Sequence, residues 1–223
     1  MRDKARRAFY AIKRNIQIDI PIRIWLKIIK KVIEPIALYG CEVWGPLTEQ
    51  EFTKWDKHPI ETLQTELCKI LLRVQRKTPN NACRAELGLY PLIIMIQKRA
   101  IKFHAHLKNS DEQTLHHKAL AYQELKPENN ALGRSVLQLT SQTDNKNIAT
   151  PNQITKTQKE KYLKHWTDAT AKQSKLECYL ALNRKYELAG YLSKVSDPKL
   201  RKVLSMYRLS EHSLSIETGR PGC

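Results

Sequence analysis

The residues best suited to chemistry are five cysteines and seven histidines, and their spacing favours neither a nucleophile nor a metal site. Cys83 could act as a thiolate beside a histidine, but no spacing in the sequence supports such a dyad. His104 and His106 are two residues apart, so a helix would point them in different directions and away from a shared ion. Structural zinc sites usually show tighter pairs of ligands. We therefore expect no catalytic residue, metal or cofactor.

The motifs of common enzyme classes are also missing from the sequence. It contains no glycine-rich phosphate loop, no G-x-S-x-G, no H-E-x-x-H and no C-x-x-C. It also lacks the adjacent aspartates with which a two-metal polymerase holds its magnesium ions. The sequence therefore predicts a protein that is not an enzyme and has no small-molecule substrate.

The charge of the chain points to a polyanionic partner. There are 39 lysines and arginines against 22 aspartates and glutamates, a formal net charge of +17 spread along the whole length. Neutralising phosphates releases counterions, so such a protein would bind nucleic acid generally and in a salt-sensitive way. We expect RNA or DNA as the partner, contacted non-specifically through the phosphate backbone.

Two basic helix faces are the candidate contacts for that backbone. Tyr162 and Trp166, beside the second face, could stack on bases, but aromatic residues at helical spacing are more often buried, and we expect these two in the core. The predicted nucleic-acid-binding residues are Arg6, Arg7, Tyr10, Lys13 and Arg14 on the first face, and Lys161, Lys164, Lys172 and Lys175 on the second.

The elements that position these faces are predicted to be helices, because glycine is scarce and apolar residues recur at helical spacing. Pro35 should kink or end the helix after Pro21, and Gly88 should stop the helix that begins at Thr78-Pro79. Capping boxes are expected at Thr48 with Glu51 and at Ser110 with Gln113. The helices are expected at about 3–17, from 21, from 59, from 78, from 91, from 110 to 125, at 155–193 and at 198–207, with the aromatic segment 38–46 buried.

The fold class is predicted to be all-α, a compact multi-helix bundle followed by a long helix and a short helical tail. The stretch at 127–153 is rich in Asn, Thr, Ser and Gln, which is typical of a linker. This composition predicts a bundle at 1–126, a polar linker at 127–153 and a C-terminal helical segment at 154–223.

Cysteine usage and hydropathy bear on the compartment. An odd number of cysteines without paired spacing favours free thiols and a reducing environment. The most apolar stretch, 20–45, carries too many charges to span a bilayer. We expect an intracellular protein, in the nucleus or cytoplasm, with no membrane partner.

Four segments together resemble a known family. KARRAFYAIKRNI, VIEPIALYGCEVWG, the stretch PIETLQTELCKILLRVQRKTPNNACRAELGLYPL and YRLSEHSLSIETGR occur in this order, at 4–16, 32–45, 59–92 and 207–220. They resemble the region C-terminal to the polymerase palm in LINE-type non-LTR retrotransposon reverse transcriptases. The LYG-x-EVWG and TPN-x-A-x-x-AELG segments carry most of this resemblance, and neither is a catalytic motif.

The resemblance implies a thumb-like helical region that helps to hold template RNA and target DNA, with the polymerase core as a further partner. The palm aspartates and the endonuclease of the family would lie before Met1, and a zinc knuckle would follow Cys223. The expected protein is thus a catalytically inactive fragment, truncated at both ends. Two alternatives stay open: a helical module that docks onto a protein partner, and a translated pseudogene remnant without selected activity.

Overall fold

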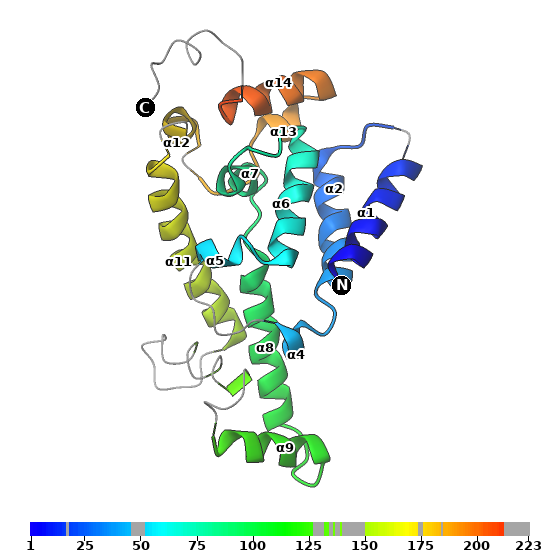
Figure 1. The fold of residues 1–223 in the computed structure, drawn as a ribbon, viewed down its shortest axis with the longest axis vertical. Helices are drawn as coiled ribbons and strands as arrows, with labels where there is room; N and C mark the ends of the chain where they lie inside the picture. The colour runs from blue at the N-terminus through cyan, green and yellow to red at the C-terminus, as the bar shows by residue number, and fades with distance from the viewer. Residues whose placement is uncertain are drawn as a thin grey trace.

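The computed structural model describes residues 1–16, 18–45, 52–126, 150–173, 176–183 and 185–211, with isolated positions between 132 and 139. These residues confirm the all-α class, since their one β-type pairing is an isolated bridge between Leu87 and Leu188 (Figure 1). The helices are α1 (Arg2–Asn15), α2 (Ile22–Ile28), the π-helix η1 (Ile29–Ile33), α3 (Glu34–Ala37), α4 (Cys41–Trp44), α5 (Phe52–Trp55), α6 (Pro59–Leu72), α7 (Asn80–Glu86), α8 (Leu92–Lys108), α9 (Leu115–Glu124), α11 (Pro151–Ala171), α12 (Glu177–Leu182), α13 (Tyr191–Lys194) and α14 (Pro198–Arg208).

The N-terminal helices show how the predicted proline kink is accommodated. Pro35 has no N–H, and in a regular helix its ring would clash with the carbonyl of Lys31. The chain instead passes through one turn of π-helix, η1, directly before α3, and the helical path continues. Trp25, Ile29 and Ile33 are buried along this path, whereas Val32 is exposed.

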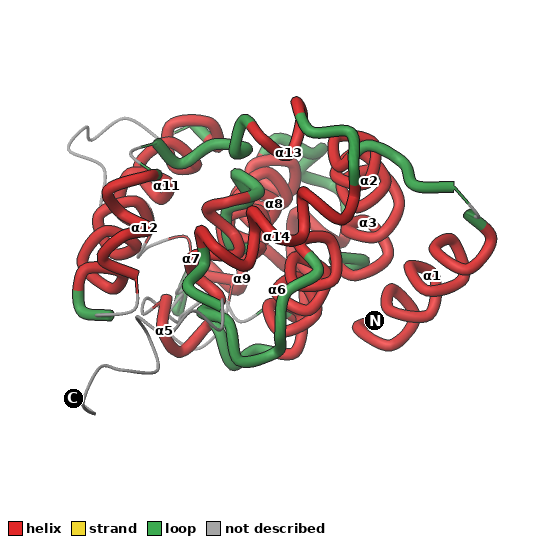
Figure 2. The backbone as a smooth tube through the Cα atoms, turned by 90° about the horizontal axis from the view of Figure 1, so that it is seen from above, coloured by secondary structure: helices red, strands yellow, loops and turns green. Residues whose placement is uncertain are grey.

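The helix α6 lies between α1 and α2 on one side and α7 and α11 on the other (Figures 1 and 2). It begins at Pro59 as predicted and buries Ile60, Leu63, Leu67 and Leu71. His58 precedes it, and its Nδ1 accepts the N–H of Ile60 at 3.3 Å. The N-terminus of α6 is therefore capped by a neutral imidazole.

The end of α7 confirms Gly88 as a stop signal and shows why glycine is required. Its φ of +62° is left-handed, and the N–H of Leu89 reaches back to the carbonyl of Arg84 at 2.9 Å. A Cβ on Gly88 would come within 2.7 Å of the backbone nitrogen of Leu188. The backbone of the C-terminal part therefore presses directly against this turn, where Ala189 also donates to the carbonyl of Glu86.

The C-terminal helices share the core of the N-terminal ones. The helix α11 packs along α8, and one hydrophobic cluster runs from Phe9 through Leu67 and Ile93 to Tyr162 and Leu209. A smaller cluster joins Ile101, Leu139 and Ile154. The described parts of 1–126 and 154–223 therefore pack into one body and do not form separate cores.

Several local predictions were wrong. The predicted helix 155–193 is three separate helices, α11, α12 and α13. The first of them, α11, begins earlier than predicted, at a capping box formed by Thr150 and Gln153.

Two predicted helix starts and one buried segment also differ from the structure. Ser110 does not cap α9, because the N-cap residue of that helix is Thr114. The helix α7 begins at Asn80 and not at Thr78. In the segment 38–46, Leu38 and Cys41 are buried as expected, but Tyr39, Val43 and Trp44 are exposed. The predicted box at Thr48 and Glu51 and the tail at 212–223 lie outside the described residues.

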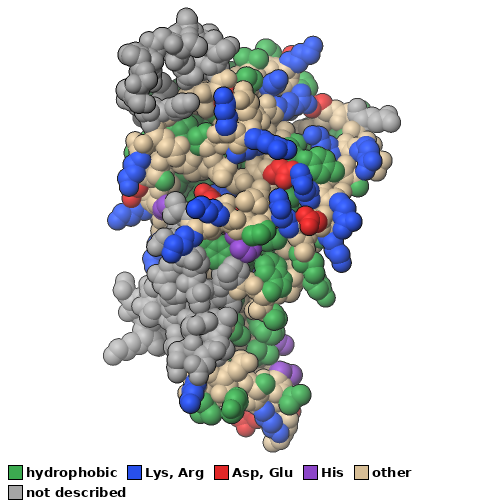
Figure 3. All heavy atoms as spheres, viewed as in Figure 1, with side chains coloured by type: hydrophobic (Ala, Val, Ile, Leu, Met, Phe, Trp, Pro, Cys, Tyr) green, Lys and Arg blue, Asp and Glu red, His purple; other side chains and the backbone are tan. Residues whose placement is uncertain are grey.

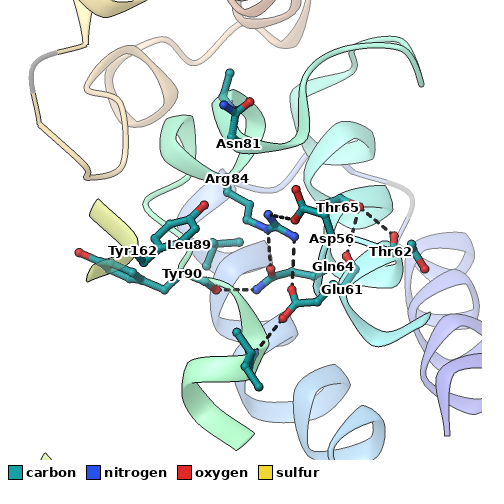
Figure 4. Close-up of polar contacts among 12 residues, drawn as sticks. Asp56, Glu61, Thr62, Gln64, Thr65, Asn81, Arg84, Leu89, Tyr90 and Tyr162 are labelled. Atoms are coloured by element: carbon teal, nitrogen blue, oxygen red, sulfur yellow. Dashed lines mark hydrogen bonds and ion pairs between the residues drawn. The ribbon is translucent and has the colours of Figure 1, made fainter. Parts of the chain in front are cut away.

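A buried arginine joins the start of α6, the end of α7 and the start of α8 (Figure 4). The Arg84 guanidinium donates to Asp56 at 2.6 Å, to Gln64 at 3.1 Å and to Glu61 at 3.3 Å. The other oxygen of Glu61 accepts the N–H of Ile93 at 2.8 Å, which caps α8. Arg84 and Glu61 are each only 1% exposed, so water solvates neither charge. The ion pair and the hydrogen bonds of this network replace the lost hydration.

The replacement Arg84→Ala should lower the free energy of unfolding by about 3–5 kcal/mol, because it leaves the Glu61 carboxylate buried without a cation. Denaturant unfolding followed by circular dichroism measures this. As a control, Arg76→Ala removes an exposed arginine and should shift stability by less than about 0.5 kcal/mol. Equal midpoints for both variants would mean that the network does not support the fold.

The cap at His58 predicts a pH dependence. Burial lowers the pKa of His58 in the folded chain, so the unfolded chain takes up its proton first. The free energy of unfolding should therefore fall as the pH drops below about 6.5, the ordinary histidine value. His58→Asn keeps a cap that does not titrate, and its stability should fall less over the same range. Parallel curves for the two proteins would contradict this.

Candidate nucleic-acid interface

The structure divides the predicted α1 face into a paired part and an exposed part. Arg6 donates to Glu66 of α6 at 3.0 Å, and the Tyr10 hydroxyl donates to the same carboxylate oxygen at 3.1 Å. These two side chains therefore hold α1 against α6, and Glu66 neutralises the charge of Arg6. Arg7, Lys13 and Arg14 are exposed, and they are the predicted cations of α1 that can reach a ligand.

The α11 face is exposed where its lysines lie. Lys161, Lys164 and Lys172 are all exposed, while Lys175 lies outside the described residues. Tyr162 and Trp166 are 2% and 6% exposed, which confirms that they belong to the core. Both pack against Tyr186, with ring centroids 5.7 and 5.2 Å apart, so their rings are not available for stacking on bases.

The two predicted faces do not form one surface. In Figures 1 and 2, α1 and α11 lie on opposite sides of the molecule, with α6 and α8 between them. In the view of Figure 3 the basic side chains gather over the upper half, toward α1 and α14, and are sparser at the lower end around α9. A strand that follows one face would thus leave the other face free.

A pocket of about 270 Å³ opens between α1, α2, the end of α6, α13 and α14. Its apolar lining includes the buried residues Phe9, Trp25 and Leu192. Its polar lining consists of four basic side chains, one carboxylate and one hydroxyl: Lys13, Arg73, Arg201, Lys202, Asp19 and Ser205. Only Lys13 was among the predicted site residues.

Sequence reasoning could not find the other cations of this pocket, because the fold brings them together from distant parts of the chain. Arg73 pairs with Asp19 at 3.0 Å, and Arg201 pairs with the other oxygen of the same carboxylate. Asp19 lies in the connection between α1 and α2, whereas Arg73 ends α6 and Arg201 lies in α14. No local spacing relates such positions.

The three described cysteine side chains lie where thiolate chemistry is disfavoured. Cys41, Cys68 and Cys83 are buried free thiols. Burial raises the pKa of Cys41 to about 11 and that of Cys68 to about 12, and it raises the pKa of Cys83 as well, which disfavours the reactive thiolate. His104 bonds Glu124 at 3.1 Å, while His106 is exposed. Among the described residues, no three His, Cys, Asp or Glu side chains gather in a way that could hold a metal.

Comparisons with protein-family models, with curated proteins and with solved structures find no match to this chain. Within the described part of the chain, no helix is both long enough and apolar enough to cross a membrane.

Proposed function

We propose that this chain is a non-catalytic helical unit that binds RNA or DNA non-specifically through the phosphate backbone. The observation that carries the proposal is the exposure of the α1 cations Arg7, Lys13 and Arg14, of which Lys13 also lines the pocket together with Arg73 and Lys202. Exposed cations can approach phosphates without first giving up a buried partner. The resemblance to the region after the palm of LINE-type reverse transcriptases supports the same role, in the nucleus or cytoplasm.

The α11 lysines form a second contact surface in this proposal. The α11 face presents no stacking platform, because the aromatic residues beside its lysines are buried. Phosphate contacts position a strand without reading its bases. The expected binding is therefore weakly dependent on sequence and strongly dependent on salt.

Charge reversal on α1 should weaken binding of a labelled single-stranded RNA and reduce its salt dependence. The plot of log affinity against log salt has a negative slope, to which each phosphate contact on a single strand contributes about 0.7. Arg7→Glu, Lys13→Glu and Arg14→Glu together should therefore reduce the magnitude of this slope by about 2. Fluorescence anisotropy over a salt series measures the slope.

The matched control reverses three positive charges on a different part of the surface. Lys102, Lys118 and Lys126 are exposed residues in or near α8 and α9, and their replacement by Glu should leave more of the slope intact. Equal losses for the two triple variants would show that net charge alone, and not the α1 face, governs binding. No binding by the wild-type protein at low salt would refute the proposal.

A second candidate function, a helical module for protein association, is favoured by the outer side of α14. This helix turns Arg201 and Ser205 inward and exposes an apolar stripe at helical spacing. The stripe consists of Leu200, Val203, Leu204 and Tyr207, which are 56%, 60%, 36% and 54% exposed. Contiguous exposed apolar side chains are typical of association surfaces.

If this stripe mediates association, the sedimentation coefficient should rise with protein concentration at high salt, where charge repulsion is screened. Leu200→Ser with Val203→Ser should then hold the protein at the mass of a monomer, since it removes the apolar area that would be buried. Lys199→Ser, on the same helix, is the control and should behave as the wild type. A wild-type monomer at every concentration would count against self-association.

A further inference from the structure

The pocket beneath α14 has a charge excess that its own ion pairs do not neutralise. Asp19 is the one carboxylate in its lining and faces four basic side chains, which leaves three positive charges in excess. Lys13 and Lys202 are exposed, and the side chain of Arg73 is 48% exposed. Three of the four cations can thus reach a ligand at the mouth of the pocket.

The shape of the pocket limits that ligand to a small one. Its volume of about 270 Å³ is below the range of roughly 300–1,000 Å³ that holds a drug-sized molecule. The apolar lining residues Phe9, Ile22 and Trp25 are only 0%, 5% and 9% exposed, so they offer little surface to a ligand. A small anionic group is therefore the ligand that fits both the size and the charge of the pocket.

Arg73 is held in a backbone conformation that its residue type disfavours. It ends α6 with a φ of +57°, in the left-handed region where glycine is usual. The side chain projects from this position to Asp19, and the same carboxylate holds Arg201. A strained residue that aims a charge into a pocket is a reason to suspect a ligand there.

We propose that this pocket binds the terminal phosphate monoester of a nucleotide. The phosphate lies among Lys13, Arg73 and Lys202, and the sugar and base lie outside the pocket. A monoester carries about −1.5 to −2 charges near neutral pH, more than an internal phosphodiester, and so matches the excess of positive charge. If the ligand is the end of a strand, this inference rests on the proposed nucleic-acid binding. If the ligand is a free nucleoside monophosphate, the inference is independent of it.

The experiment compares short oligonucleotides of one sequence that carry a 5′-phosphate, a 3′-phosphate or no terminal phosphate. Adenosine monophosphate and adenosine, titrated by calorimetry, report the free nucleotide. A terminal phosphate should tighten strand binding by about tenfold, as expected for one added charge-assisted contact. Adenosine monophosphate should bind and adenosine should not.

Arg73→Gly separates binding from folding. Glycine relieves the left-handed backbone, so this variant should fold with stability at least equal to the wild type. It should nevertheless lose the preference for phosphorylated ends, as should Lys202→Ala. Lys199→Ala, which removes an exposed lysine of α14 outside the pocket, should retain it.

The outcomes distinguish the two proposals. Salt-sensitive strand binding with no effect of the terminal phosphate, together with no binding of adenosine monophosphate, overturns the pocket and leaves the backbone interface standing. Binding of the monophosphate without binding of any strand supports the pocket and refutes the interface. Retention of the phosphate preference by Arg73→Gly would also overturn the pocket.

Discussion

The architecture depends on one buried charge and on the groups that surround it. Arg84 cannot be deprotonated at physiological pH, so its position in the core is tolerable only while Asp56, Glu61 and Gln64 remain in place. These partners belong to the start of α6 and the segment before it, and Glu61 also caps α8. The network therefore fixes the angles at which α6, α7 and α8 meet, and the basic surfaces are carried on the helices that pack around them.

A second buried carboxylate extends this arrangement to the C-terminal helices. Glu86, at the end of α7, is fully buried and bonds Arg208 of α14 at 2.5 Å. The same α14 brings Arg201 and Lys202 to the pocket. The pocket and the buried network are thus connected through α7 and α14, so the part of the pocket that α14 contributes is anchored to the core.

Local signals in the sequence predicted where several helices begin and end, but not which side chains contact one another across the fold. Prolines at 59 and 198 and the glycine at 88 mark ends correctly, because capping and left-handed turns depend on a few adjacent residues. The burial of Trp166 also followed from its spacing. Glu66 could not be foreseen as the partner of Arg6 and Tyr10, since it is 60 residues from the former. The pocket could not be predicted for the same reason. The orientation of α14 could not be predicted from its apolar residues either, because this helix buries Arg201 and Ser205 and exposes Leu200 and Val203.

The contact of Gly88 with the backbone near Leu188 has a consequence for how the chain folds. It joins positions about a hundred residues apart in the sequence by main-chain hydrogen bonding, in a molecule whose other regular structure is local. Closing so long a loop is entropically unfavourable and slows folding relative to a bundle of adjacent helices. During synthesis, α6, α7 and α8 can form early, but the buried face of α7 stays open to water until the chain has been made past about residue 190. The nascent protein therefore exposes part of its core while about a hundred further residues are added.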